Sequence, residues 1–186
     1  LLVGPSGTVY RYDIAGRLVE IAPVAADATV FDYGPDGLLA TERAGPHVRH
    51  FTYDIAGRVA GIAVDGLGTS VFTYDTAGRR RSQTAPDGTT IAFAWNDLDQ
   101  LVSITRTSPD ATVHHLAIDV DALGRPRRIN GVDIDPGATA PVTVAGVVVL
   151  GARAYDPLTH QFLSADPLMV VPGSSGGARA CAYARH

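Results

Sequence analysis

The stretch YDIAGR occurs twice in this chain, at Tyr12–Arg17 and at Tyr53–Arg58, and a near copy, YDTAGR, lies at Tyr74–Arg79. A catalytic motif is normally present once, whereas a repeated motif indicates one structural unit that is built several times. Aligning the copies places aromatic residues at successive spacings of 21, 20, 21 and 21 residues, namely Tyr12, Tyr33, Tyr53, Tyr74 and Trp95. An even period of this length predicts a repeat architecture.

Each copy has the sequence pattern of a β-hairpin. Alternating apolar and polar residues, such as VFTY at Val71–Tyr74, lead into an Asp-x-x-Gly segment. Asp is favoured at the first position of a type I turn, because its carboxylate accepts backbone N–H groups, and Gly is favoured at the fourth. An Arg and a second apolar stretch follow, as in RVAGIAV at Arg58–Val64. We therefore expect two antiparallel strands joined by a connection of about four or five residues.

A second set of turns separates these hairpins from one another. Pro, Asp and Gly cluster in DGLGTS at Asp65–Ser70, in PDGTT at Pro86–Thr90 and in SPDAT at Ser108–Thr112. Each repeat is then two short strands and two turns, and residues 1–118 form a continuous antiparallel ribbon. With 20 Gly and 12 Pro spread along the chain, no helix of useful length is expected. The predicted fold class is all-β.

Three further copies depart from the common pattern. YGPDGL at Tyr33–Leu38 moves the Asp but keeps Gly37 in register, and WNDLDQL at Trp95–Leu101 replaces the Asp by Asn96 and loses the Gly. DALGRP at Asp121–Pro126 is a degenerate copy that comes a few residues late. Departure from the pattern at one end of the array, as in the last two copies, is expected of a terminal element that must differ from its neighbours.

Composition restricts the classes of partner. The 186 residues carry a net charge of −4 at a calculated pI of about 5.8, which argues against a nucleic-acid partner. The single cysteine, Cys181, excludes an internal disulfide and is expected to be a small buried residue. The longest apolar stretch, VTVAGVVVLGA at Val142–Ala152, is too short for a membrane helix and predicts a buried strand. The chain does not begin with Met, so we expect a piece of a longer protein.

The pattern YDxxGRL at a period of about twenty resembles the YD repeat of the Rhs family. That family includes the C components of bacterial insecticidal toxin complexes, Rhs polymorphic toxins and the teneurin shells of animals. RAYDPLTHQFLSADPL at Arg153–Leu168 resembles the Rhs-associated core signature, R-x-Y-D-P-x-x-G-R-F-x-S-x-D-P. ALGRPRRI at Ala122–Ile129 resembles the segment HLGTPR that precedes this signature, and YARH at Tyr183–His186 resembles the start of the element that follows it.

His160 and Gln161 stand where the signature has Gly-Arg. Since Gly tolerates a positive φ and His does so poorly, this departure argues against the family's tight turn at this point.

The resemblance implies a division of the chain and a function. Residues 1–118 are the YD-repeat hairpin array, a segment of a spiral β-shell, and residues 119–186 are the Rhs-associated core domain, truncated at its C-terminal end. In the family the shell encloses a toxin that lies downstream in the same chain, and the core domain plugs one end. The implied role is a structural wall and plug that encapsulates and delivers that cargo, with a secreted or cell-surface location. A teneurin-like adhesion protein is the alternative that belongs to the same family.

The resemblance also implies an enzymatic alternative. In bacterial members the core domain is an aspartyl autoprotease that releases the toxin, and Asp166 and Arg153 match its catalytic positions. Two carboxylates must share a proton in such a site, and the second acid lies in a later element that would follow His186. We therefore expect no activity from this chain alone. The residues by themselves favour a turn role for Asp166 and Asp156, each of which precedes Pro, and Arg153 could equally be a surface residue in an ion pair.

No cofactor or metal site is expected. GSSGG at Gly173–Gly177 matches G-x-S-x-G but lacks a strand before it and a helix after it, so a loop is favoured. Adjacent His114 and His115 point to opposite faces of a predicted strand, and His47 with His50 suits a solvated sheet edge better than zinc. DIDPG at Asp133–Gly137 begins like a calcium loop but lacks the later Glu.

Two expectations concern surfaces. The repeated Tyr side chains are expected to pack against the neighbouring hairpin rather than to form a sugar-binding ladder. An unpaired strand edge is a template for pairing with another chain, so self-association through exposed edges is expected.

Overall fold

A computed structural model describes the whole chain except residues 5, 123, 135–141, 151–152 and 165–186. It falls into two compact units, one comprising Leu1–Thr69 and a second that begins at Ser70. The described residues form strands and turns with no helix, which confirms the all-β prediction.

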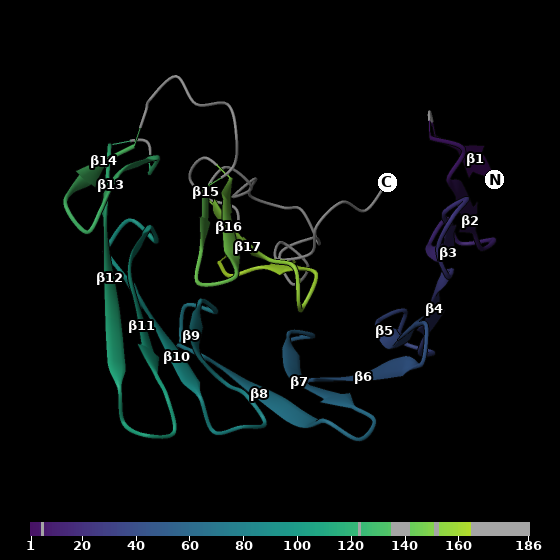
Figure 1. The fold of residues 1–186 in the computed structure, drawn as a ribbon, viewed down its shortest axis with the longest axis horizontal. Coiled ribbons are helices and arrows are strands. Elements are labelled where there is room, and N and C mark those ends of the chain that lie inside the picture. The colour runs from purple at the N-terminus through teal and green to yellow at the C-terminus, as the bar shows by residue number, and fades with distance from the viewer. Residues whose placement is uncertain (5, 123, 135–141, 151–152, 165–186) are drawn as a thin grey trace. The chain divides into compact units, whose positions relative to one another are not determined.

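Fourteen strands follow one another in sequence order in an antiparallel sheet, here called the long sheet (Figure 1). Those of the first unit are β1 (Leu2–Val3), β2 (Val9–Tyr12), β3 (Leu18–Ala22), β4 (Thr29–Tyr33), β5 (Leu39–Ala44), β6 (His47–Tyr53) and β7 (Val59–Val64). The remaining strands are β8 (Gly68–Tyr74), β9 (Arg80–Thr84), β10 (Thr90–Trp95), β11 (Leu101–Thr107), β12 (Val113–Val120), β13 (Pro126–Ile129) and β14 (Val132–Asp133). Sequence neighbours are therefore sheet neighbours, as the repeat pattern predicts.

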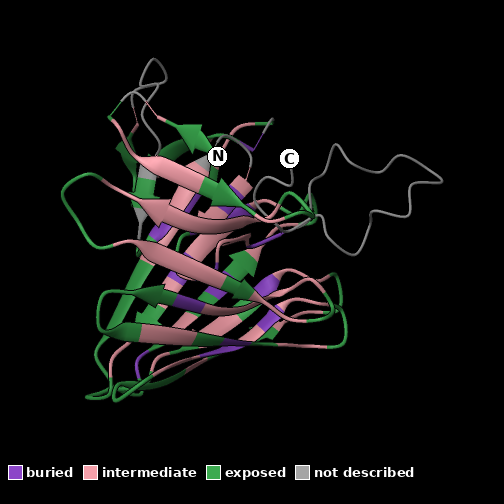
Figure 2. Ribbon diagram, turned by 90° about the vertical axis from the view of Figure 1, so that its right-hand side faces the viewer, coloured by how far each residue is buried: buried purple, intermediate pink, exposed green. Residues whose placement is uncertain are grey.

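One face of the long sheet carries a row of large rings. Two residues before each repeat aromatic stands another aromatic residue, and a period of two places both on one face of the strand. The row consists of Tyr10, Phe31, Phe51, Phe72 and Phe93. Phe51 is opposite Ile62, and Phe93 is opposite Ile104. Exposed residues such as Thr52 and Thr73 alternate with the rings, and Figure 2 shows buried positions as short bands along the strands.

The prediction of a solvated edge at His47 and His50 is wrong. Both residues lie in β6, which pairs with β5 on one side and β7 on the other, so this strand is internal to the sheet. Their side chains are nonetheless exposed, and His50 Nε2 lies 3.4 Å from Asp65 Oδ1.

Four strands form a second antiparallel sheet, here called the short sheet. They are β15 (Val142–Val144), β16 (Val147–Leu150), β17 (Arg153–Asp156) and β18 (Gln161–Phe162). The single strand predicted within Val142–Ala152 is instead a hairpin, because Ala145 and Gly146 have φ of 51° and 84°. Two successive residues at positive φ make the tight two-residue turn that a run of valines conceals.

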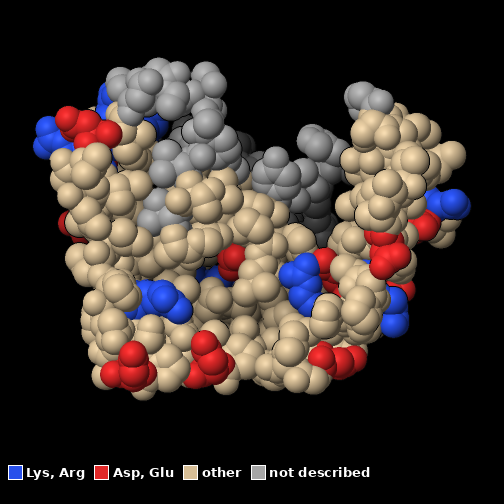
Figure 3. All heavy atoms as spheres, viewed as in Figure 1, with Lys and Arg blue, Asp and Glu red and all other residues tan. Residues whose placement is uncertain are grey.

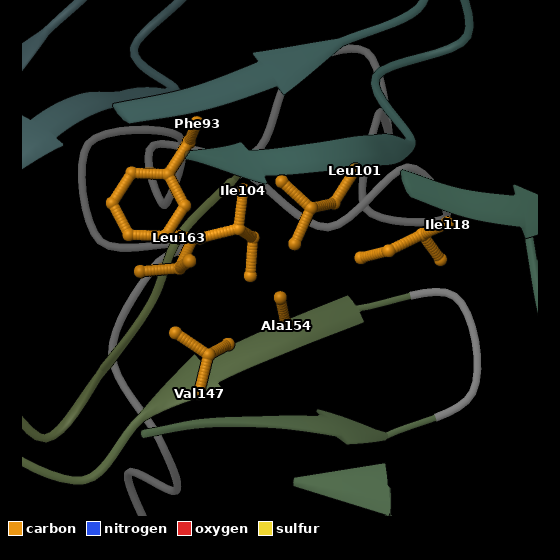
Figure 4. Close-up of a cluster of buried hydrophobic side chains, with 7 residues drawn as sticks. All are labelled: Phe93, Leu101, Ile104, Ile118, Val147, Ala154 and Leu163. Carbon is orange, nitrogen blue, oxygen red and sulfur yellow. The ribbon is translucent and has the colours of Figure 1, made fainter. Parts of the chain in front are cut away.

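The short sheet packs on β10 to β12 within the second unit. A buried apolar cluster joins the two sheets, with Val147, Ala154 and Leu163 on one side (Figure 4). Their partners across the cluster are Phe93, Leu101, Ile104 and Ile118. Ile104 and Leu163 are fully buried, so this cluster is the hydrophobic core of the unit.

Candidate functional site

The repeating turn, here called the YD turn, has one geometry that its Asp determines. In the copy at residues 54–58, the N–H of Asp54 donates to the carbonyl of Arg58 and the N–H of Gly57 donates to the carbonyl of Asp54, both at 2.9 Å. Asp54 Oδ1 accepts the N–H groups of Ala56 and Arg58, the contact for which Asp is favoured at the first position of such a turn. Gly57 has φ of 75°, the left-handed conformation that favours glycine. The predicted turn chemistry is confirmed.

The Arg that follows Gly16, Gly57 and Gly78 completes the turn in these copies, a role that the sequence pattern did not reveal. Arg58 Nε donates to Asp54 Oδ2 at 2.7 Å, and the copies at Arg17 and Arg79 repeat this contact at the same distance. The carboxylate is therefore fully used, with one oxygen on the backbone and the other on the guanidinium.

Successive repeats are joined by their aromatic residues. The hydroxyl of Tyr33 donates to the carbonyl of Leu18 at 2.7 Å, and the hydroxyl of Tyr53 donates to that of Leu39 at 2.8 Å. Trp95 Nε1 donates to the equivalent carbonyl, that of Arg80, at 2.8 Å. These contacts confirm that the repeat aromatics pack against the neighbouring hairpin.

Two degenerate copies keep hydrogen bonds of the YD turn, the first of them with an Asn in place of the Asp. Asn96 accepts the same two N–H groups and pairs with Gln100, and Asp99 takes the glycine position at φ of 59°. In the late copy, the N–H of Asp121 donates to the carbonyl of Arg125 and Arg125 Nε donates to Asp121 Oδ2. The late copy thus keeps the Asp–Arg hydrogen bonds of the YD turn.

Backbone N–H donation holds the pKa of the Asp13 carboxyl below its ordinary value of 3.8, and the Arg17 N–H contributes most. The N–H groups of Thr89 and Thr112 have the same effect on Asp87 and Asp110 in the turns at the opposite ends of the strands. These carboxylates stabilise turns in their ionised form.

The contact between the two sheets contains one buried ion pair. Arg80, on β9, is fully buried, and its Nη1 lies 3.0 Å from Asp156 Oδ2, at the end of β17. Its Nη2 donates to Thr159 Oγ1 at 3.2 Å, and its backbone N–H donates to the carbonyl of Leu163 at 2.7 Å. The predicted turn role of Asp156 is confirmed, since its Oδ1 accepts the N–H of Leu158, but the pairing with Arg80 was not predicted.

The turn that follows Asp156 is tight, although His160 stands where the family signature has Gly. His160 has φ of 55°, so it adopts the left-handed conformation in place of glycine. The pairing of Asp156 with Gln161 closes the turn over four residues. The expectation of a looser turn is wrong, because the strand pairing on either side determines the backbone here.

Arg153 is half-buried and lies against the same turn. Its guanidinium stacks over the ring of Phe162 at 3.4 Å, and its Nη2 donates to the carbonyl of Ser164 at 3.4 Å. Asp166 lies outside the described residues. GSSGG at Gly173–Gly177, Cys181 and the YARH element lie outside them as well.

A small cavity lies between the two sheets of the second unit. The cavity lined by Leu101, Ile118, Val149 and Arg153 has a volume of about 10 Å³, room for about one water molecule. Among the described residues, no group of three or more His, Cys, Asp and Glu side chains could hold a metal ion, and no helix is long and apolar enough to cross a membrane. Figure 3 shows separate patches of both charges on the face in view.

Residues 74–113 match the family model for the RHS repeat. The chain carries an RHS repeat. The matched segment begins at the aromatic residue of one YD turn and includes the next, so Arg80 and Trp95 both lie within it. No curated protein sequence matches the chain.

Solved structures share the fold of this RHS-repeat chain. The crystal structure of TcdB2-TccC3 superposes with a TM-score of 0.50 at 18% identity over 82% of this chain. The structure of the Photorhabdus luminescens Tc holotoxin pore gives the same TM-score and identity over 83%. This chain spans 9% of the length of each of those chains. At this identity the likeness concerns the fold alone.

Proposed function

We propose that the chain is a section of the wall of a shell that encloses a toxin, with the short sheet as the start of its plug. The division at residues 118 and 119 belongs to the same proposal, as does a secreted or cell-surface location. The observation that supports it most is the recurring pattern of hydrogen bonds within and between the repeats. The turns at Asp13, Asp54 and Asp75 repeat the same Asp-centred hydrogen bonds, and repeat aromatics donate to the preceding hairpin. Such a sheet extends by adding units.

The apolar face supports the same function. Within the second unit, Phe93 of the ring row packs against Val147, Ala154 and Leu163 in the apolar cluster. A wall that binds a plug through its apolar face needs such apolar contact between the long sheet and the short sheet. The fold that the chain shares with the Photorhabdus luminescens Tc holotoxin pore supports a role in a toxin assembly.

The full-length natural protein allows the test. It is treated with protease before and after mild detergent, and the downstream segment is followed by immunoblot while particles are imaged by electron microscopy. Enclosure predicts a hollow particle and a protected downstream segment. Val59→Asp, at a position with 1% exposure, should open the wall and abolish protection, whereas Ile14→Asp, at a fully exposed turn tip, should not. Rapid digestion of the untreated wild-type segment would exclude enclosure and favour a surface adhesion role.

A second candidate, autoproteolysis, draws on the position of Arg153. The hydrogen bond to the carbonyl of Ser164 holds this arginine beside the residues that precede Asp166 in the sequence. If the full-length protein cleaves itself, Asp166→Asn should leave it intact on a denaturing gel and Asp13→Asn should not. Cleavage that persists in Asp166→Asn removes this residue from the mechanism.

A further inference from the structure

Arg80 occupies a position that is apolar in the other repeats. The residue that follows the Arg position of each YD turn begins the next strand and has its carbonyl near the following repeat aromatic. In the neighbouring copies this residue is Leu18, Leu39, Val59 or Leu101. A fully buried guanidinium at such a position needs a specific partner, because burying an unpaired charge is strongly unfavourable.

That partner comes from the short sheet. Asp156 and Thr159 bind the two Nη atoms, and the carbonyl of Leu163 accepts the backbone N–H. The ring of Phe72 lies 4.5 Å from the guanidinium carbon and covers its face. Asp156 is itself 4% exposed, so the contact removes both charges from water.

We propose that Arg80 is the specificity-determining residue that selects the repeat on which the short sheet docks, with Asp156 as its complement. Docking one repeat away would place the carboxylate of Asp156 opposite Val59 or Leu101. Neither side chain can donate a hydrogen bond, so the buried carboxylate would lose its partner. The apolar repeats therefore reject the short sheet, and the one repeat with an arginine accepts it. This inference does not depend on what the wall encloses.

The apolar cluster alone would not provide this selection. Rings and aliphatic side chains recur along the long sheet, so Val147, Ala154 and Leu163 would find a similar surface on several repeats. Hydrophobic contact is non-directional, whereas an Arg–carboxylate pair has a fixed geometry.

The test compares four forms of the whole chain by amide hydrogen exchange and methyl NMR. They are the wild type, Arg80→Met, Arg80→Met with Asp156→Leu, and Arg81→Met as a control at the adjacent exposed arginine. Arg80→Met should lower exchange protection across residues 153–164 by about a hundred-fold or more, since it leaves a buried carboxylate unpaired. Protection of the YD turn at residues 54–58 should stay within about three-fold, and Arg81→Met should match the wild type throughout.

The double variant separates specificity from stability. Removing both charges should restore protection to within about ten-fold, since two apolar side chains replace the pair. The methyl signals of Val147 and Leu163 should then appear as more than one set, because no pair selects the repeat. A single set with wild-type contacts to Ile104 would overturn the proposal, and so would full protection in Arg80→Met. If Arg80→Met does not fold, the double variant decides alone, and its failure to fold would likewise overturn the proposal.

Discussion

The hydroxyl of Tyr33 lies 2.7 Å from the carbonyl oxygen of Leu18, so one repeat donates a hydrogen bond to the backbone of the repeat before it. The guanidinium of Arg17 stacks over the same ring, 4.6 Å from its centroid. Tyr33 therefore stacks with an arginine of the preceding turn and donates a hydrogen bond to the strand that follows that turn. These two contacts explain why the aromatic, the Asp and the Arg recur together at one period.

Tyr33→Phe removes the hydroxyl and leaves the carbonyl of Leu18 without this donor. We expect the free energy of unfolding to fall by about 1 kcal/mol, the usual contribution of a partly buried hydrogen bond. Denaturant unfolding followed by circular dichroism measures the change. Tyr12→Phe is the matched control, because Tyr12 is 41% exposed, and it should change stability by less than about 0.5 kcal/mol. Equal effects of the two substitutions would show that the contact between repeats contributes nothing.

Backbone conformation predicts that substitutions at two turn positions change the stability of the protein in opposite directions. Gly57 has φ of 75°, and a Cβ there would meet only Leu38 at 4.0 Å, so Gly57→Ala tests the conformation rather than crowding. It should destabilise the protein by about 1 to 2 kcal/mol. Ala111 has φ of 65° at the end of the turn that begins at Ser108, and Ala111→Gly should stabilise by about 0.5 to 1 kcal/mol. Thermal melts of both variants check the signs, and a loss of stability in Ala111→Gly would contradict the argument.

Local turn chemistry made much of the fold predictable from sequence. The Asp and Gly of the YD turn act within five residues, so their roles can be recognised in a single copy and confirmed by the period. Contacts between distant segments could not be found this way. Nothing in GRRRS, which contains Arg80, indicates that the side chain meets Asp156 far along the chain. An arginine at an otherwise apolar position of the repeat was the signal that could have found it.

The wrong expectations at Val142–Ala152 and at the turn containing His160 have a common cause. His160 and Ala145 adopt positive φ although neither residue favours it, because paired strands on both sides fix the ends of the turn. Residue preference is a weak guide where strand pairing determines the backbone.

The ion pair between Arg79 and Asp99 should stabilise the contact between two successive YD turns. Arg79 Nη1 lies 2.8 Å from Asp99 Oδ1, and Asp99 is 56% exposed. We expect a coupling energy of about 0.5 kcal/mol in a double-mutant cycle of Arg79→Met and Asp99→Asn, since exposed pairs contribute little. The coupling should fall when NaCl is raised to about 1 M, because salt screens exposed charges. A cycle of Arg11→Met with Asp99→Asn, which combines charges from different contacts, should show no coupling beyond error.

Acid should weaken the protein through the turn carboxylates. In the folded chain backbone N–H donation holds the pKa values of Asp13, Asp87 and Asp110 below the ordinary value of 3.8. The unfolded chain therefore takes up protons first as pH falls, and each group contributes stability that is present above pH 4 or so and is lost as pH falls through the folded-state pKa. The midpoint of urea unfolding should thus be level near pH 6 and decline below about pH 4.

Substitution by Asn separates these groups from the rest of the chain. Asn keeps the accepting oxygen, as Asn96 does in its own turn, but does not titrate. The triple variant Asp13→Asn, Asp87→Asn and Asp110→Asn should therefore show a shallower decline of the urea midpoint between about pH 4 and pH 2.5 than the wild type. Asn96→Asp places a titrating carboxylate under the same two N–H donors and should make the decline steeper. Parallel curves for all three proteins would mean that the turn carboxylates do not govern acid stability.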